Sequence, residues 1–261
     1  MAVAPIARPN CLDSCGQNIS IPFPFGIGTG CYLDKQFEIE CNQTAKPPRA
    51  YIRSIKLEVV NISVDRGAAI VKGPIISFNS SGRQAGLPVN LTGTPFIFSY
   101  RNVFVAMGCN TRAVMTDIQP YLIGCESTCK DQSANVNLLG TDFCSGKNCC
   151  ASSISSFVQV FNPRLEALDD NQGKNGRWWA FLASDEWFTS NKTDSLAVPY
   201  MDYVPMELFW IASNLDLEKS PVHCELRNDN RSLAAGCHCY MDSYEGNPYL
   251  KSGCTARKGK G

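Results

Sequence analysis

Fourteen cysteines in 261 residues constrain this chain more than any other feature of its sequence. They form three groups, at 11–41, 109–150 and 224–254, and the stretches between these groups contain none. Zinc sites usually bring together two cysteine pairs at two-residue spacing with histidines nearby, whereas these cysteines have wider spacings or are adjacent. Clustered cysteines of this kind are typical of disulfides in an oxidising compartment, so we expect an extracellular chain with no metal site.

We expect every cysteine to be oxidised, and the adjacent Cys149 and Cys150 to pair with different partners. The remaining connectivity is open, because fourteen cysteines allow many pairings. The cysteines expected in disulfides are Cys11, Cys15, Cys31, Cys41, Cys109, Cys125, Cys129, Cys144, Cys149, Cys150, Cys224, Cys237, Cys239 and Cys254.

Asparagine sequons indicate the same compartment. Seven Asn-x-Ser/Thr triplets occur, against about two or three expected by chance from the composition. Glycan-bearing asparagines must face solvent, so these positions also predict surface. The predicted glycosylation sites are Asn18, Asn42, Asn61, Asn79, Asn90, Asn191 and Asn230.

Both ends of the chain look unlike the rest. Residues 1–10 lack the apolar core of a signal peptide, so we interpret them as a leader that replaces a removed signal, and 255–261 as a tail. No apolar run is long enough to cross a bilayer, and we expect membrane attachment only through a transmembrane segment absent from this chain.

Hydrophobic patterning predicts a mainly-β fold. Alternating segments rich in Val, Ile, Phe and Tyr are separated by Gly, Pro, Asn and Ser, while helical periodicity is confined to 164–170 and a turn at 184–188. The predicted strands are 37–41, 51–62, 68–78, 95–107, 154–161 and 196–204.

Charge is distributed unevenly although the formal net charge is zero. Residues 1–125 carry 11 basic and 7 acidic side chains, whereas residues 126–236 carry 9 and 15. A zero total gives no reason to expect a nucleic-acid partner, but the first region contains a candidate anion-binding surface. The densest basic stretch, 46–56, contains no acid. Ordinary solvated charges are an equally good reading of any single residue.

Motifs spread along the chain resemble a known family. Residues 11–26 read CLDSCGQNISIPFPFG and are followed by Gly30-Cys31-Tyr32 and FEIEC at 37–41, which resembles the galacturonan-binding region of plant wall-associated receptor kinases. Segments 108–110, 124–129 and 144–150, followed by WAFL at 179–182 and VPMELFW at 204–210, resemble the second region of those ectodomains. Segment 237–254 is similar to part of an EGF-like module.

The resemblance implies a disulfide-rich, two-lobe extracellular module with a short cysteine-rich EGF-like tail. We expect a galacturonan-binding-like lobe at 11–125, a second lobe at 126–236 and the partial EGF-like segment at 237–254. The chain departs from the family at Arg177-Trp178-Trp179, where many members carry a cysteine, so the family's disulfide pairing cannot simply be transferred.

Catalysis is a poor reading of these residues. Only His223 and His238 exist, and His238 lies between two cysteines, which leaves little for an assisted nucleophile. Asp169/Asp170 and Asp185/Glu186 are adjacent pairs, and neighbouring residues of a strand point to opposite faces. We therefore expect no enzyme activity and no cofactor in this chain.

Binding is the remaining function. The resemblance implies pectin or oligogalacturonide as the partner, and arginine can hold a carboxylate through two parallel hydrogen bonds. Aromatic rings could stack on sugars, although core packing is the better reading for each. The alternatives are a receptor for a wall protein or peptide and a wall-adhesion module without a defined saccharide site. The predicted saccharide-binding residues are Arg49, Arg53, Lys56, Arg83 and Arg101, and the possible aromatic platforms are Tyr32, Tyr51, Tyr100, Trp178 and Trp179.

Overall fold

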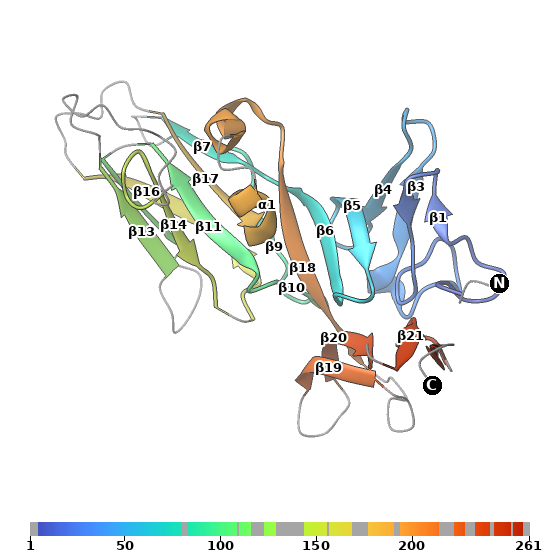
Figure 1. Cartoon of the computed structure of the whole chain (residues 1–261). Helices are drawn as coiled ribbons and strands as arrows, with labels where there is room; N and C mark the ends of the chain where they lie inside the picture. The colour runs from blue at the N-terminus through green and yellow to red at the C-terminus, as the bar shows by residue number, and fades with distance from the viewer. Residues whose placement is uncertain are drawn as a thin grey trace. The chain divides into compact units, whose positions relative to one another are not determined.

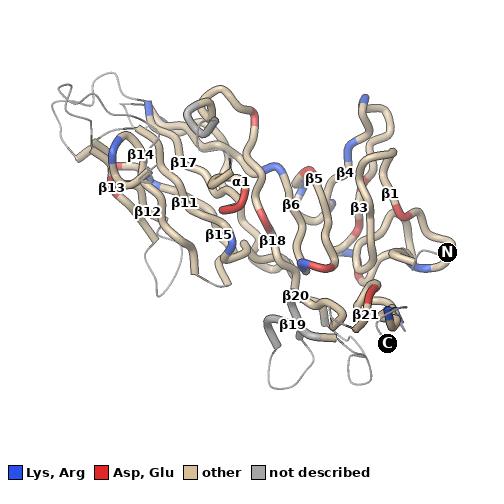
Figure 2. Tube along the Cα trace, in the orientation of Figure 1, with Lys and Arg blue, Asp and Glu red and all other residues tan. Residues whose placement is uncertain are grey.

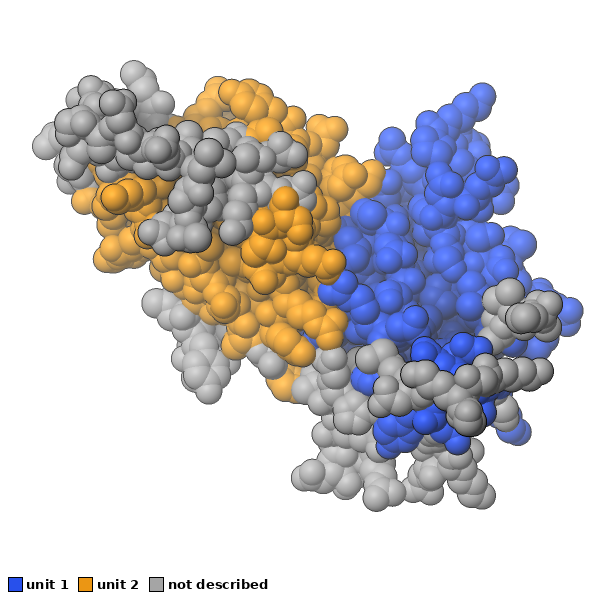
Figure 3. Space-filling model, in the orientation of Figure 1, with its two compact units in different colours: residues 1–71, 93–97, 208–261 blue, residues 72–92, 98–207 orange. Residues whose placement is uncertain are grey.

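Strands dominate the fold, as the patterning predicts (Figure 1). The computed structural model describes residues 5–79, 83–108, 110–115, 123–128, 144–155, 157–168, 177–190, 194–213, 222–227, 233–240, 243–251 and 253–257. The chain forms two compact units (Figure 3). Unit 1 contains residues 1–71, 93–97 and 208–261, and unit 2 contains residues 72–92 and 98–207. The consecutive regions 11–125, 126–236 and 237–254 stay a prediction.

Unit 1 is built around one antiparallel sheet whose strands come from both ends of the chain. Along the sheet the order is β19-β20-β18-β6-β5-β4-β3, and β10 also pairs with β18. The elements are β1 (Ser14–Cys15), β2 (Ile19–Ser20), 3-10 helix η1 (Lys35–Phe37), β3 (Ile39–Asn42), β4 (Arg49–Ile52), β5 (Leu57–Ser63), β6 (Ala68–Gly73), β10 (Phe96–Phe98), β18 (Val204–Ser213), β19 (Val222–Arg227), β20 (Leu233–Cys239), β21 (Tyr244–Gly246) and β22 (Cys254–Ala256). The last residues of β6 and β10 and the first of β18 belong to unit 2.

The segment 51–62, expected as one strand, is divided into β4 and β5. A turn over residues 53–56 separates them, and Lys56 takes a left-handed φ of 56° there. The Lys56 N–H donates to the Ile52 carbonyl at 2.8 Å, which closes the turn. The Arg53 N–H donates to the Glu38 carbonyl at 3.0 Å, so the turn lies beside the residue that precedes β3.

An aromatic cluster fills the core of unit 1. The Phe25 ring lies 5.3 Å from Phe37, 5.1 Å from Trp210 and 6.0 Å from Phe96, between ring centroids. These four side chains are fully buried. Contacts of this kind add to the free energy gained by burying apolar surface, so they hold the amino-terminal loops against β10 and β18.

The carboxy-terminal segment packs into this core. Tyr249 lies 5.7 Å from Trp210, and its hydroxyl accepts a hydrogen bond from the Cys237 N–H. The buried Asn247 amide donates to the carbonyls of Ile6 at 2.8 Å and Phe23 at 2.6 Å. The segment expected as an EGF-like tail therefore forms part of unit 1, while its EGF-like character stays a prediction.

Unit 2 contains a five-stranded sheet in the order β14-β11-β17-β7-β8 and a three-stranded sheet in the order β13-β12-β16, while β9 and β15 pair separately. The elements are β7 (Ile76–Asn79), β8 (Gln84–Ala85), β9 (Val89–Asn90), β11 (Asn102–Met107), β12 (Thr111–Met115), β13 (Ile123–Ser127), β14 (Cys149–Ser153), β15 (Val160–Phe161), β16 (Pro163–Ala167), β17 (Arg177–Ser184), α1 (Asp185–Ser190) and 3-10 helix η3 (Asp194–Tyr200).

One face of the five-stranded sheet is covered by the two helices. Phe181 of β17 packs in one cluster with Phe188 of α1 and Val198 of η3, and Trp179 and Trp187 lie at its half-buried margin. The burial of β17 falls along this face from Phe181 to the exposed Arg177.

Three local predictions are wrong. Residues 154–161 were expected as one strand, but among those that the structure describes only Val160–Phe161 forms a strand, β15. Residues 164–170 favour helix by composition, yet Pro163–Ala167 forms strand β16, because pairing with β12 outweighs intrinsic propensity. Residues 196–204 were expected as a strand, but most of them form η3, which contains Pro199. The turn expected at 184–188 is confirmed as the start of α1.

Disulfides connect cysteines within each of the three sequence groups. As predicted, Cys149 and Cys150 have different partners. The pairs are Cys11–Cys31, Cys15–Cys41, Cys125–Cys150, Cys144–Cys149, Cys224–Cys237 and Cys239–Cys254. Cys109 and Cys129 lie outside the described residues, and no described cysteine is free.

Candidate functional site

The exposed face of strands β3, β4 and β5 carries several charged residues of unit 1. Register places Tyr51 opposite both Glu40 and Glu58, and Arg49 opposite Asn42. Alternate residues of the same strands, such as Ile52, are buried. Because side chains alternate across a sheet, one face enters the core and the other presents these polar groups to solvent.

Arg49 belongs to a small polar network on this face. Its Nη1 lies 3.8 Å from Glu58 Oε2, and 52% of the arginine side chain is exposed. A hydrogen bond with the Tyr51 side chain, followed by the charge of Glu58, raises the pKa of Arg49 above its ordinary value. The guanidinium is therefore oriented by its neighbours while remaining open to solvent.

Arg53 and Lys56 lie in the turn between β4 and β5. Arg53 Nη1 lies 2.9 Å from Glu38 Oε1, with 58% of the arginine side chain exposed. Figure 2 shows both basic and acidic positions along the trace of β3, β4 and β5. Lys56 is exposed, as predicted, and forms no ion pair with any described residue. The basic stretch lacks acids in sequence but has them in space, because β3 and β5 bring Glu38 and Glu58 alongside.

Glycosylation sequons border the same surface. Asn42 stands directly across from Arg49, and Asn61 lies further along β5. Both are exposed, as are Asn18, Asn79 and Asn90, which agrees with the prediction that sequon asparagines face solvent. Asn191 and Asn230 lie outside the described residues. A glycan on Asn42 would narrow the approach to Arg49.

Arg101 has a different environment from the arginines of unit 1. Its Nη1 lies 3.4 Å from Oε1 of Glu207, a carboxylate with no exposed surface. Ser99 Oγ donates to the same oxygen at 2.8 Å. Asn102 donates to the Glu207 carbonyl and accepts from the Glu207 N–H. Arg101 thus compensates a buried charge, which favours a structural role over ligand contact.

Arg83 lies at the start of β8, in the hairpin that joins it to β7. Its N–H donates to Asn79 Oδ1 at 2.8 Å, and its carbonyl accepts from the Asn79 N–H at 3.1 Å. The Arg83 side chain is exposed. Arg83 and Arg101 belong to unit 2 and the other three predicted residues to unit 1, so the five do not form one set within a unit.

The aromatic side chains considered as sugar platforms differ in how much of their surface is exposed. Trp178 is 7% exposed and belongs to the core, as the core reading predicts. Tyr51 and Trp179 are half-buried at sheet surfaces, and Tyr100 is 44% exposed, 5.8 Å from the Arg101 guanidinium. Tyr32 is also half-buried. Sequence reasoning missed Tyr203, whose ring lies 4.4 Å from Lys72 Nζ.

The described residues among those considered for catalysis lie on separate elements. Asp185 and Glu186 occupy the first turn of α1. His223 and His238 occupy opposite positions of β19 and β20, a register that sequence spacing could not reveal. Asp169 and Asp170 lie outside the described residues. Within the described ranges, no group of three or more His, Cys, Asp or Glu side chains could hold a metal ion.

Comparison with known proteins identifies the family. Residues 11–72 match the wall-associated receptor kinase galacturonan-binding family, and residues 141–218 match the wall-associated kinase family. Wall-associated receptor kinase-like 10 of Arabidopsis thaliana is 30% identical, over 94% of this chain and 38% of that protein. Wall-associated receptor kinase-like 3 of the same plant is 33% identical, over 94% of this chain and 39% of its own length. No solved structure matches.

A disulfide-bonded β module with these two regions in this order is a plant receptor ectodomain facing the cell wall. The chain belongs to the wall-associated receptor kinase family. It spans about two fifths of the length of the curated relatives named above. Among the described residues, no helix has the length and apolarity needed to cross a membrane.

Proposed function

We infer that this ectodomain binds acidic pectic polysaccharide through the exposed basic residues of unit 1. One observation carries the proposal: the region that matches the galacturonan-binding family, 11–72, includes the β3–β5 surface with Arg49, Arg53 and Lys56. De-esterified galacturonan carries a carboxylate on each sugar, which suits a row of cations. The chain itself performs no chemistry in this proposal, and any kinase activity belongs to the whole receptor.

The ion pairs of this surface shape the expected binding mode. A guanidinium has five N–H donors, so Arg53 retains donors for a ligand carboxylate while Nη1 is held by Glu38. Glu58 and Tyr51 orient Arg49 in the same way. Nearby acids also reduce the net positive potential, so we expect each contact to be weak and several to act together.

Recognition of a wall protein or peptide is the second candidate. Large apolar side chains are exposed on unit 2, including Leu87 at 81% and Tyr200 at 90%, and exposed apolar side chains can mark protein contacts. These residues lie outside the matched galacturonan-binding region. Failure of the parent to bind oligogalacturonide at all would favour this alternative.

The test removes the three cations without reversing charge. We expect the triple variant Arg49→Gln, Arg53→Gln, Lys56→Gln to bind de-esterified oligogalacturonide roughly tenfold more weakly in calorimetric titration, with circular dichroism unchanged.

A matched variant controls for net charge. Arg66→Gln, Lys251→Gln, Arg257→Gln removes the same charge from exposed positions of unit 1 outside this surface, and should retain the parent's affinity. If both triple variants bind oligogalacturonide equally weakly, the loss of affinity comes from the change in net charge and not from a specific site. Parental affinity in the first variant would reject the proposed site.

A further inference from the structure

The end of the five-stranded sheet in unit 2 carries a second pair of exposed arginines. In the strand order β17-β7-β8, Arg177 pairs with Asn79, and Asn79 exchanges two hydrogen bonds with Arg83. The three residues therefore form one row across three adjacent strands. Arg177 was noted in the sequence only as a departure from the family pattern.

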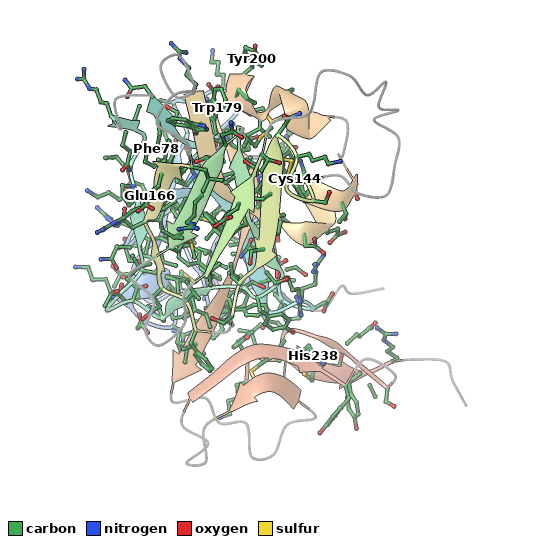
Figure 4. All side chains as sticks on the ribbon, turned by 90° about the vertical axis from the view of Figure 1, so that its left-hand side faces the viewer. Phe78, Cys144, Glu166, Trp179, Tyr200 and His238 are labelled. Carbon is green, nitrogen blue, oxygen red and sulfur yellow. A yellow bond between two sulfur atoms is a disulfide. The ribbon has the colours of Figure 1, made fainter. Side chains whose placement is uncertain are left out.

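Register places the whole row on one face. The next row toward the core contains Trp179 opposite Ser77, and Ser77 opposite Ala85. Residues two apart along a strand share a face, so Trp179 lies beside Arg177 on the same side of the sheet. Figure 4 labels Trp179 and Phe78 on neighbouring strands, and Phe78 belongs to the opposite, buried face.

This face is open to solvent at the end of the sheet that carries the two arginines. Arg177, Asn79 and Arg83 are exposed, and Trp179 and Ser77 are half-buried. Further along β17, Phe181 is fully buried in the cluster formed with α1 and η3. We call this exposed end of the face the floor. It consists of the small side chains of Asn79, Ser77 and Ala85, with Arg177 of β17 and Arg83, directly before β8, on its two sides. Trp179 lies at its inner border.

Charge is unbalanced on this floor. Strands β7, β8 and β17 contain no acidic residue. Neither Arg83 nor Arg177 forms an ion pair with a described residue, unlike Arg49, Arg53 and Arg101. Two guanidiniums on a common face that form no ion pair with a described residue favour an anionic ligand, since each can hold a carboxylate with two N–H donors.

We propose that this floor is a second contact site for acidic saccharide, formed by Arg83, Arg177 and Trp179. Neighbouring strands are about 4.8 Å apart, so positions two strands apart are separated by roughly 10 Å, which suits a ligand with several carboxylates along its length. Trp179 offers an apolar ring face to a sugar beside the charges. The ligand class rests on the proposed function, whereas the site is separate from the unit 1 surface.

The experiment compares Arg83→Gln, Arg177→Gln with the parent in calorimetric titration against de-esterified oligogalacturonide. We expect affinity to fall about threefold to tenfold, with unchanged thermal unfolding. The control Lys147→Gln, Arg164→Gln removes the same charge from exposed positions of unit 2 outside the five-stranded sheet and should keep parental affinity.

Asn79 lies in a sequon, so the comparison is repeated in a Ser81→Ala background that removes the sequon but keeps Asn79. Loss of affinity in that background alone would mean that a glycan covers a working site, which supports the proposal. If the arginine variant keeps the parent's affinity in both backgrounds, the second site is overturned. This holds even if the unit 1 triple variant binds weakly, which would leave the proposed function standing. Absence of any binding by the parent would overturn this inference together with the proposed function.

Discussion

In unit 2 the Arg101 guanidinium lies 3.4 Å from a carboxylate with no exposed surface, whereas in unit 1 the Arg53 guanidinium lies 2.9 Å from one that reaches solvent. The two contacts look alike as ion pairs but differ in consequence. A buried carboxylate that loses its cation keeps the full cost of desolvation, whereas an exposed carboxylate is hydrated by water. Whether the paired carboxylate is buried therefore distinguishes an arginine with a structural role from one that remains available to a ligand.

Removal of a disulfide is expected to have the largest effect on stability, and the size of that effect should differ between the units. Cys15–Cys41 closes a separation of 26 residues in unit 1, and Cys144–Cys149 one of 5 in unit 2. We expect Cys15→Ala, Cys41→Ala to lower the free energy of unfolding by about 3.5 kcal/mol and Cys144→Ala, Cys149→Ala by about 2 kcal/mol, because longer loops lose more entropy on closure. Denaturant unfolding of the two variants measures the difference, and equal losses would refute the loop-length argument.

Replacing Arg101 tests the buried pair directly. Arg101→Met should lower the free energy of unfolding by about 3 kcal/mol, because the Glu207 carboxylate loses the cation 3.4 Å from it and remains buried. The double variant Arg101→Met, Glu207→Gln should recover part of the loss, since the buried charge is gone. A loss below about 1 kcal/mol in the single variant would show that Arg101 is not needed by the fold.

The exposed pair of unit 1 should respond in the opposite way. Glu38→Gln should change the free energy of unfolding by at most about 1 kcal/mol, because the pair is open to solvent. The same change should strengthen oligogalacturonide binding about twofold to fivefold by removing a carboxylate that competes for Arg53. Glu166→Gln, an exposed site of unit 2, serves as the charge-matched control. Weaker binding by Glu38→Gln would mean that Glu38 positions the guanidinium more than it competes.

Sequence alone predicted features that depend on local pattern or on cysteine chemistry. The mainly-β class, the exposure of the described sequon asparagines and the separate partners of Cys149 and Cys150 follow from such rules. The strand at 163–167 could not be predicted, because its pairing with β12 overrides local helix propensity. Local propensity therefore fails here where tertiary pairing determines the conformation.

The candidate site was also predictable only where it depends on local sequence. The basic stretch 46–56 was recognisable from its composition, but its pairing with Glu38 and Glu58 depends on which strands become neighbours. Likewise, Arg177 joins Arg83 only through the register of β17 and β7. Charge counts along a chain identify cations, whereas only long-range register decides which of them are compensated.

The most direct test of this account is calorimetric titration of the parent ectodomain with de-esterified oligogalacturonide at low and high salt, repeated with the methyl-esterified form. Exposed guanidinium contacts are screened over about 8 Å at physiological ionic strength. We expect the affinity to fall roughly tenfold from low to high salt, and the neutral ester to bind poorly at both salt concentrations. Equal affinity at the two salt concentrations, or equal binding of acid and ester, would contradict it.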